Sequence, residues 1–474
     1  MSADRQSRSA RLPWGLSVAL ARAARASIRA TGRSGGTTLP GRVLTEVRPD
    51  AIERMASEIP GGSIIVSSTN GKTTTAAMIS SVLAAGGRSV LHNKAGSNMH
   101  WGVATTLLDS TDLPEDALGL FEIDEAWVSR LAPILNPKLV VLGNLFRDQL
   151  DRYGELERLA DEWSAMVAGL PEDCGLVLCA DDPSVADLAA SLPPGRKAVY
   201  FGMEDLDQAL AEKSHAFDAK YCGRCGGQYS YERTFIGHLG HYRCSSCGHT
   251  RPTEVQVRAT SVDLRGLSGS EVEFDTPVGH SSLTLPLPGL YNVYNALAAI
   301  AAGYAMGEPL DSIVEGVSAT ASVFGRSERI ELDEGALALL LIKNPTGANE
   351  VLRTLGNEAS DSGQTGDLDL WIGLNDRIAD GRDVSWVWDA DFEPLADRIG
   401  SVTCSGTRAA EMALRLKYAG WPVDRLIVDE DLERSLLAAV ERSEGTLYAL
   451  PTYTALLEVR GKLAERGHTD DFWL

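Results

Sequence analysis

The sequence predicts an α/β protein of two domains, each built on a parallel sheet with helices on both faces. Short apolar, strand-like runs alternate with helical patterns after residue 45, and a second series of the same kind begins near residue 330. Residues 213–253 interrupt this alternation with a Gly- and Tyr-rich stretch that holds two C-x-x-C pairs. The length of 474 residues exceeds one ordinary core, which agrees with two α/β domains and an inserted module.

The composition narrows the class of protein. Hydrophobic residues make up 44% and charged residues 23% of the chain, as in ordinary globular proteins. The net charge of -21 argues against a general nucleic-acid binder, because phosphate backbones are held by basic surfaces. No apolar run reaches the roughly 18 residues that a membrane-spanning helix needs. Seven cysteines, four of them in C-x-x-C pairs, indicate a metal site in a reducing compartment, and we therefore expect a cytoplasmic protein.

The segment 1–45 is expected to be a basic arm that contains an amphipathic helix. Residues 1–42 carry eight Arg and a single Asp. Arg22, Arg25 and Arg29 interrupt its apolar stretch, which distinguishes the segment from a secretory signal. Two interpretations remain open. We favour a helix packed on the body of the protein over a helix that makes peripheral contact with an anionic membrane face.

The central region, 46–325, is expected to form the first α/β domain, with residues 213–253 as an insertion. Its expected strands are 63–68, 117–124, 138–144, 175–180 and 197–202, and its expected helices include 72–87, 155–170 and 292–306. The C-terminal region, 326–474, is expected to form the second domain. Its expected strands are 336–342, 368–374, 400–406, 425–429 and 446–451, with helices at 408–420 and 431–443. The polar stretch 356–367 is expected to be a mobile loop.

The sequence IIVSSTNGKTTT (64–75) indicates a phosphate-binding loop. A strand that runs through a tight turn into a helix directs backbone N–H groups and the helix dipole to one point. Gly71 allows close backbone approach, Lys72 can reach terminal phosphates, and the Thr73 hydroxyl can bind Mg²⁺. Further oxygen ligands for Mg²⁺ are expected at the ends of the next strands. The candidates are Glu122, Asp124, Glu125, Asn144, Asp148, Gln149 and Asp151.

The two C-x-x-C pairs predict a structural zinc site. Cys222 and Cys225 are separated from Cys244 and Cys247 by 18 residues. This spacing fits a ribbon in which four thiolates close a tetrahedral Zn²⁺ site and leave no open position for catalysis. The metal would stabilise a module too small for a core of its own.

A set of motifs resembles the ATP-dependent Mur ligases and, within them, the MurT family of synthetase subunits. The shared motifs are TNGKTTT, EIDE, NLFRDQLDRYGE, ADDP (180–183), YNVYNALAA (291–299) and GRSE (325–328). The narrower resemblance depends on the four-cysteine insertion, KNPTGANE (343–350) and ADGRDVSWVWDADFE (379–393). It implies a Mur ligase-like ATPase domain with an inserted zinc ribbon, followed by a second, Rossmann-like α/β domain.

The resemblance also implies roles for individual residues. Thr69, Asn70, Gly71, Lys72, Thr73 and Thr74 would hold the triphosphate of ATP. Glu122 would bind Mg²⁺ together with Thr73, Asn292 and Asn295 would lie on the adenine side, and Arg326 would contact phosphate. Three positions depart from the usual Mur pattern: Ser68 replaces Gly, Gly143 replaces Thr, and Gln149 replaces a metal-binding His.

The function implied by the resemblance is amidation of lipid II. MurT-type chains use ATP to activate the D-glutamate carboxyl of the stem peptide, and ammonia converts it to D-isoglutamine. A GatD-type glutamine amidotransferase would supply the ammonia, because Cys174, Cys179 and Cys404 lie in no elbow typical of a cysteine nucleophile.

An aspartate of the DGRDVSW stretch would complete the partner's Cys-His-Asp arrangement. We favour Asp383 for this role over its neighbours Asp376, Asp380, Asp389 and Asp391. Trp386 and Trp388 suit an interface with the partner.

Two other functions remain open from the sequence. A stand-alone Mur-type or folylpolyglutamate-type ligase would add an amino acid without any partner. A zinc-ribbon ATPase could bind nucleic acid as a regulator, although the few Arg residues of the ribbon make a thin basic footprint.

Overall fold

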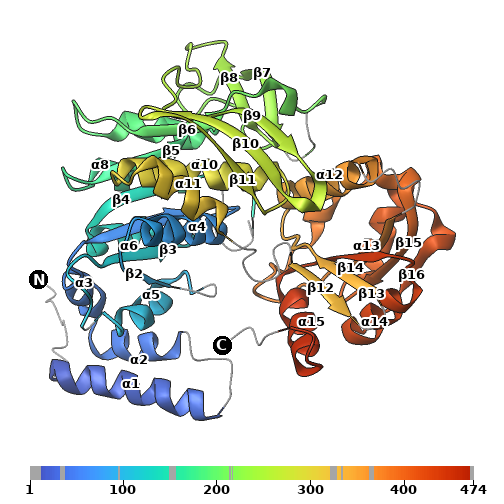
Figure 1. Ribbon diagram of the computed structural model, residues 1–474, viewed down its shortest axis with the longest axis horizontal. Coiled ribbons are helices and arrows are strands. Elements are labelled where there is room, and N and C mark those ends of the chain that lie inside the picture. Colours follow the sequence, from blue (N-terminus) through green and yellow to red (C-terminus); the bar gives the residue numbers. More distant parts are fainter. Residues whose placement is uncertain are drawn as a thin grey trace, which may run out of the picture.

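The computed structural model describes residues 12–31, 38–93, 97–110, 112–148, 156–212, 215, 217–320, 328–332, 335–361 and 368–469. Figure 1 shows two α/β domains side by side, with helices α1 and α2 beneath the first and the hairpin β7–β8 above it. The N-terminal helices are α1 (Trp14–Thr31), α2 (Leu39–Val47) and α3 (Ala51–Ala56). Helix α1 packs on the body: the Arg22 guanidinium donates to the Leu108 carbonyl, and Arg25 pairs with Asp109. This arrangement agrees with the interpretation that we favoured.

The first domain is built on a nine-stranded sheet of order β11-β10-β9-β6-β5-β4-β1-β3-β2. Its strands are β1 (Ser63–Ser67), β2 (Val90–His92), β3 (Leu118–Glu122), β4 (Pro137–Leu142), β5 (Gly175–Cys179), β6 (Val199–Met203), β9 (Val257–Leu264), β10 (Ser270–Thr276) and β11 (Gly279–Leu285). A parallel sheet was expected, and in sheet order β9, β6, β5, β4, β1, β3 and β2 do run parallel, whereas β10 and β11 add an antiparallel edge. The sequence analysis did not identify the strands within 257–285. Their alternation of buried and exposed residues is the pattern of a sheet edge with one solvated face.

Helices cover both faces of this sheet. They are α4 (Lys72–Ala85), α5 (His100–Leu107), α6 (Val128–Leu135), α8 (Leu156–Ala168), α9 (Pro183–Ala186), α10 (Leu290–Ala305) and α11 (Leu310–Ser318). Helices α4, α10 and α11 pack against one another on one face. From β1 the chain moves out to the edge strand β2, and from β2 it moves back across the sheet through β3, β4 and β5, so right-handed crossovers put α6 and α8 on the face opposite α4. The connection that leaves β1 therefore lies on the opposite face from those that leave its neighbours β3 and β4, and such switch points are where ligands bind in open α/β sheets.

The second domain has a six-stranded sheet of order β12-β13-β17-β14-β15-β16, in which only β12 is antiparallel among the described strands. The strands are β12 (Glu328–Leu332), β13 (Gly335–Leu339), β14 (Leu368–Gly373), β15 (Ile399–Ser405), β16 (Leu426–Val428) and β17 (Thr446–Pro451). The helices are α12 (Pro345–Asp361), α13 (Ala409–Tyr418), α14 (Leu432–Arg442) and α15 (Tyr453–Glu465). The expected boundary between residues 325 and 326 lies outside the described residues.

One expectation about this domain is wrong. Residues 356–361 are not a loop but the end of helix α12. Val351, Leu352 and Leu355 are buried and anchor the helix to the core. The Glu358 carboxylate accepts a hydrogen bond of 2.7 Å from the Leu267 backbone N–H, so a tertiary contact extends a helix that its polar sequence did not predict. Residues 362–367 lie outside the described residues.

In the part of the chain that the structure describes, no helix has both the length and the apolar content needed to cross a bilayer.

Candidate active site

The phosphate-binding loop follows β1 and leads directly into α4. Gly71 stands before the first helical residue with φ of 88°, in the left-handed region. A Cβ atom there would lie 1.9 Å from the Asn295 side-chain oxygen, so glycine is required both for the turn and for the close approach. The Asn144 side chain holds the loop from outside: its oxygen accepts from the Asn70 N–H at 2.9 Å, and its amide donates to the Asn70 carbonyl at 3.0 Å.

Lys72 is buried at the start of α4 among carboxylates. Its Nζ lies 3.2 Å from Glu125 Oε2 and donates to the Ser68 carbonyl at 3.2 Å. Burial alone would lower the pKa of Lys72, but the charges of Glu125, Asp124, Glu122 and Asp148 outweigh it and raise the pKa above its ordinary value. Lys72 therefore keeps its positive charge, and its side chain can turn toward a phosphate group.

Thr73 and Glu122 lie together in front of the loop. The Thr73 hydroxyl donates to Glu122 Oε1 at 2.8 Å. Asn93 fixes Glu122 from behind, because its amide oxygen accepts from the Glu122 N–H and its amide N–H donates to the Glu122 carbonyl, both at 2.8 Å. A hydroxyl and a carboxylate at the mouth of a phosphate loop are the hard oxygen donors that Mg²⁺ prefers, so these residues fit that ion. The sequence analysis missed Asn93.

Two departures from the Mur pattern face each other in space. A Cβ atom added at Gly143 would lie 2.9 Å from the Ser68 Cβ. The residues described with φ above zero, other than glycine, are Asp112 and Asn136, so Ser68 makes the turn without backbone strain. Its hydroxyl donates to the Asn70 carbonyl at 2.7 Å. Ser68 in place of Gly and Gly143 in place of Thr are therefore one coupled change, in which the volume added on one side is removed on the other.

The second domain touches the loop through the segment after β13. Lys343 Nζ donates to the Thr69 carbonyl at 2.9 Å and pairs with Asp148 at 2.6 Å. The Asn344 amide donates to the Asn70 side-chain oxygen at 2.9 Å. The sequence analysis used these residues to recognise a motif and assigned them no role. A Lys-Asn pair directly after a strand was the available signal.

A pocket between the two domains adjoins the loop. It encloses about 780 Å³ of space, open solvent at its mouth included. The first domain contributes Gly71, Thr74, Asn144, Phe146, Tyr291, Tyr294 and Asn295, and the second contributes Leu341, Lys343, Thr346, Gly347, Glu350 and Val351. Asn295 reaches the pocket, whereas Asn292 lies behind it, donating to the Pro288 carbonyl at 2.8 Å and accepting from Asn295 at 3.0 Å.

Three residues with an expected role lie outside the described residues: Arg326, Gln149 and Asp151.

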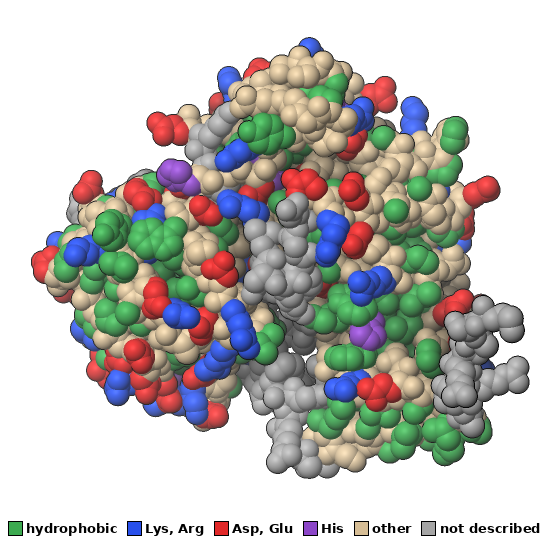
Figure 2. Space-filling view, turned by 180° about the vertical axis from the view of Figure 1, so that it is seen from behind, with side chains coloured by type: hydrophobic (Ala, Val, Ile, Leu, Met, Phe, Trp, Pro, Cys, Tyr) green, Lys and Arg blue, Asp and Glu red, His purple; other side chains and the backbone are tan. Residues whose placement is uncertain are grey.

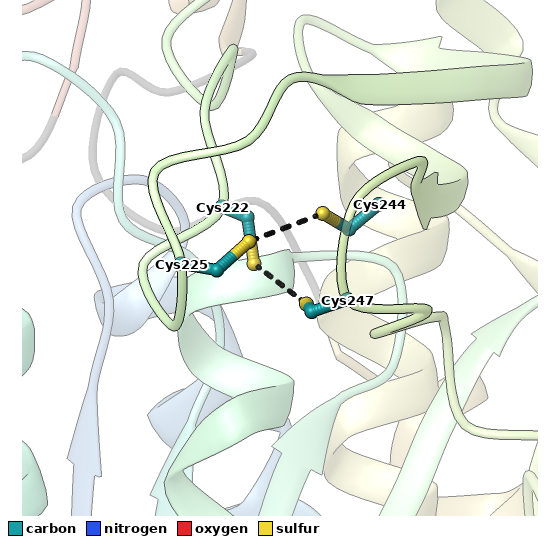
Figure 3. Close-up of side chains that lie close together, drawn as sticks. All are labelled: Cys222, Cys225, Cys244 and Cys247. Atoms are coloured by element: carbon teal, nitrogen blue, oxygen red, sulfur yellow. Dashed lines mark hydrogen bonds between the residues drawn. The ribbon is translucent and has the colours of Figure 1, made fainter.

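The four cysteines of the insertion converge between the loops at either side of the hairpin β7 (Tyr229–Ile236) and β8 (Leu239–Cys244) (Figure 3). Their sulfur atoms all lie within 4.8 Å of one another. Backbone N–H groups of Cys247 and Ser246 help to lower the pKa of the Cys244 thiol to about 6, which favours the thiolate that zinc binds. Four thiols at this separation fit a closed tetrahedral site, as the spacing predicted.

The other end of the same hairpin reaches the pocket between the domains. Ile236 and Leu239, at its turn, line the pocket next to Asn295. His238 between them is fully buried, its ring lies tilted against that of Phe146 with centroids 4.8 Å apart, and its Nε2 atom lies 3.3 Å from Asp182 Oδ2. The ribbon therefore forms a wall of the candidate site rather than a separate appendage.

Residues 376–391, after β14, include five aspartates, and four of them form hydrogen bonds or ion pairs within the chain. Asp380 accepts from the Thr454 N–H at 2.7 Å, Asp376 pairs with Arg408 at 2.8 Å, Asp389 with Arg147 at 3.1 Å, and Asp391 with Asn349 at 2.7 Å. Asp383 differs. It is exposed, and the hydrogen bond given for its carboxylate is a local one, from the Ser385 N–H at 2.9 Å.

Cys174, Cys179 and Cys404 are buried in the two cores. Burial raises the pKa of Cys174 and of Cys404 to about 12, and that of Cys179 well above its ordinary value. A nucleophilic cysteine needs the opposite environment.

The fold is that of the Mur ligases. A pseudomurein peptide ligase type C from Methanothermus fervidus superposes with a TM-score of 0.67 at 22% identity, over 88% of this chain and 81% of that one. A model described as Mur ligase middle domain matches residues 66–242, and one described as MurT ligase C-terminal matches residues 341–456.

More narrowly, the chain belongs to the MurT family. It is 33% identical to the lipid II isoglutaminyl synthase (glutamine-hydrolyzing) subunit MurT of Streptococcus pneumoniae, over 91% of this chain and 93% of that one. It is 32% identical to the subunit of the same name from Staphylococcus aureus strain N315, over 93% and 95%. The recognition made from sequence motifs is confirmed.

Proposed function

We propose that this chain is the ATP-dependent synthetase subunit of a lipid II-amidating ligase in peptidoglycan synthesis. It would convert the α-carboxyl of D-glutamate in the stem peptide to the amide of D-isoglutamine. The observation that carries the proposal is a Mur-type phosphate loop with Lys72, Thr73 and Glu122 at its mouth, in a chain that resembles MurT along nearly its whole length. That likeness favours amidation over the amino-acid addition of a stand-alone ligase.

The proposed chemistry has two steps. An oxygen of the glutamate carboxylate attacks the γ-phosphorus of ATP, ADP leaves, and an acyl phosphate forms. Ammonia then attacks the carbonyl carbon, phosphate leaves, and a proton is lost to give the amide. Lys72 and the N–H groups of residues 69–74 hold the phosphates and balance their charge. Mg²⁺, held by Thr73 and Glu122, would neutralise further negative charge on the phosphates when bound.

The ammonia is proposed to come from a separate GatD-type glutaminase. The buried cysteines with raised pKa support this view, because none of the three described outside the ribbon is suited to attack glutamine. Asp383 is proposed to orient the partner's histidine, since among the aspartates of residues 376–391 it is the exposed one, and no ion pair is shown for it. The exposed Trp388, which packs against Tyr418 with ring centroids 5.8 Å apart, lies in the same stretch and suits the interface.

Binding of one structural Zn²⁺ by Cys222, Cys225, Cys244 and Cys247 is part of the proposal. A nucleic-acid role for the ribbon finds no support. Over the described residues of the face in Figure 2, acidic and basic side chains are interspersed and form no continuous basic track.

We also propose that the protein works at the cytoplasmic face of the membrane, where lipid II is anchored. Leu16, Leu20 and Leu39 on α1 and α2 are exposed, and hydrophobic side chains gather over this end of the molecule in Figure 2. An exposed apolar edge on a basic helix is suited to weak peripheral contact.

The experiment that tests the function uses the full chain with and without a co-expressed glutaminase. Lipid II, Mg-ATP and glutamine are supplied, and the amidated product is measured by mass. We expect product with the partner present, and also with ammonium salts alone. Absence of product under both conditions would overturn the proposal. ATP turnover that instead depends on an added amino acid would favour the stand-alone ligase.

Asp383→Asn tests the shared triad. Glutamine-dependent amidation should fall by at least about 100-fold, because a triad without its orienting acid loses the working tautomer of its histidine. Ammonium-dependent amidation should stay within about threefold, since the synthetase site is untouched. Asp397→Asn, an exposed aspartate of the same domain, is the matched control. Equal loss of both activities would assign Asp383 to folding or to the synthetase site.

A further inference from the structure

One carboxyl group in the pocket between the domains is left without a partner. Glu350 lies on α12, its side chain lines the pocket, and the residue is only 4% exposed. Among the described residues, nothing forms a hydrogen bond with its Oε2 atom. A buried polar atom that lacks a partner is destabilising, so such an atom in a native protein points to a ligand that completes its hydrogen bonding.

Three other polar side chains of this pocket already form hydrogen bonds within the chain. The Asn295 side chain bonds Thr75 and Asn292, and the Tyr294 hydroxyl donates to Asp181 at 2.6 Å. Lys343 is held by Thr69 and Asp148 at the phosphate-loop end. Of Asn295, Tyr294, Lys343 and Glu350, it is therefore Glu350 whose side chain can still form a hydrogen bond with a ligand.

The protonation of Glu350 determines what it can bind. Burial raises its pKa to about 7, against a lowering effect of the nearby Arg353. The guanidinium of Arg353 donates instead to the Phe235 and Gln208 carbonyls, at 3.0 and 2.9 Å. Near neutral pH the Glu350 carboxyl is thus available as a neutral acid, which has one O–H donor and one carbonyl acceptor side by side.

The position of Glu350 along α12 fits the far end of a nucleotide. Asn344, which bonds Asn70 of the phosphate loop, precedes Glu350 by six residues, or about 9 Å of helix rise. Apolar and aromatic side chains of Ile236, Leu239 and Tyr291 line the same pocket, which suits a flat base. A base bound at Glu350 leaves room for the ribose between it and the loop.

We propose that Glu350 recognises the Watson–Crick edge of adenine. Its O–H donates to N1, and its carbonyl oxygen accepts from the 6-amino group. The ionised carboxylate would direct a second acceptor at the N1 lone pair, so the protonated acid is the form that binds. The inference rests on the proposed use of ATP, and it adds the residue that distinguishes the base.

The test compares ATP with 1-deaza-ATP, in which a C–H group replaces N1, by equilibrium binding to the full chain. Wild type should bind 1-deaza-ATP roughly 5- to 100-fold more weakly than ATP, the usual value of a paired base edge. Glu350→Leu should lose ATP affinity by a similar factor and bind the two nucleotides within about twofold of each other. Glu350→Gln, whose amide offers the same donor and acceptor, should keep the preference. Glu441→Gln, an exposed carboxylate on α14, is the matched control.

A second measurement covers the case in which Glu350→Leu does not fold. Between pH 6.5 and 8.5 the ATP affinity of wild type should fall relative to Glu350→Gln, because only the wild-type residue loses its proton. The charged groups near this carboxyl, Arg353 and Lys343, are common to both proteins. Equal binding of ATP and 1-deaza-ATP by wild type, a penalty that persists in Glu350→Leu, or coinciding pH profiles would each overturn the assignment. If wild type binds ATP and amidates lipid II but binds 1-deaza-ATP as tightly as ATP, only the proposed role of Glu350 is refuted. If it binds no ATP, the proposed function falls as well.

Discussion

Replacement of Glu350 by Gln should stabilise the nucleotide-free protein in a way that grows with pH. Burial raises the pKa of this carboxyl from 4.5 to about 7. Between these two values the folded chain keeps the proton and the unfolded chain releases it, so the free energy of unfolding falls as pH rises. The full penalty, reached above pH 7, is about 3 kcal/mol. Gln at position 350 carries no such penalty, and its advantage over Glu should rise by about 1 kcal/mol from pH 6 to pH 8.

The assay is urea unfolding of both proteins without nucleotide, followed by tryptophan fluorescence at several pH values. The measured quantity is the difference between the two midpoints, converted with a common slope. Glu441→Gln, at the surface, should show a difference near zero at every pH. A Glu350→Gln difference that is constant with pH, or that shrinks as pH rises, would show that this carboxyl is ionised in the folded protein and would refute the reasoning.

Three further substitutions test the loop and the ribbon. Gly143→Thr should destabilise the protein by about 1–3 kcal/mol through overpacking against Ser68, and adding Ser68→Gly should restore most of the loss; additive effects in thermal unfolding would contradict the coupling. Gly71→Ala should weaken ATP binding at least tenfold, because the alanine adds about 1–3 kcal/mol of backbone strain and a clash with Asn295. An unchanged ATP affinity, measured by calorimetry, would exclude this loop as the ATP-binding site. Cys222→Ser should lower the zinc content, and it should lower the ATP affinity by about tenfold, because the hairpin that the metal anchors lines the pocket. A variant with full zinc content would refute the zinc-ribbon assignment. A variant with full ATP affinity would refute the coupling between the ribbon and the pocket.

The sequence by itself determined most of the parallel strands of both sheets and the position of the phosphate loop. Each buried strand is a short apolar run bounded by turn residues, and the loop combines a strand, Gly71 and a helix in one continuous segment. The grouping of the four cysteines was predicted equally well, because the ligands of such a metal site follow a characteristic spacing along the chain. These features are local, so their physical basis lies within a few dozen residues.

Other features depend on contacts between distant segments. Helix α12 extends to Asp361 because Glu358 bonds the Leu267 N–H, about ninety positions earlier in the chain, and the polar sequence of 356–361 gives no sign of it. The antiparallel strands β10 and β11 are amphipathic edge strands whose pairing is decided by what they join.

The candidate site shows the same division. Residues 69–74 and Glu122 were visible as motifs, but Lys343 touches the loop only because the second domain folds against the first. Ser68 and Gly143 looked like two unrelated departures until their side-chain positions were found 2.9 Å apart. Glu350 ends the KNPTGANE motif, but nothing in that motif indicates that its carboxyl is buried beside a pocket. Its meaning comes from burial and from the absence of a described partner for Oε2, and only the tertiary structure decides how far a carboxyl is removed from water.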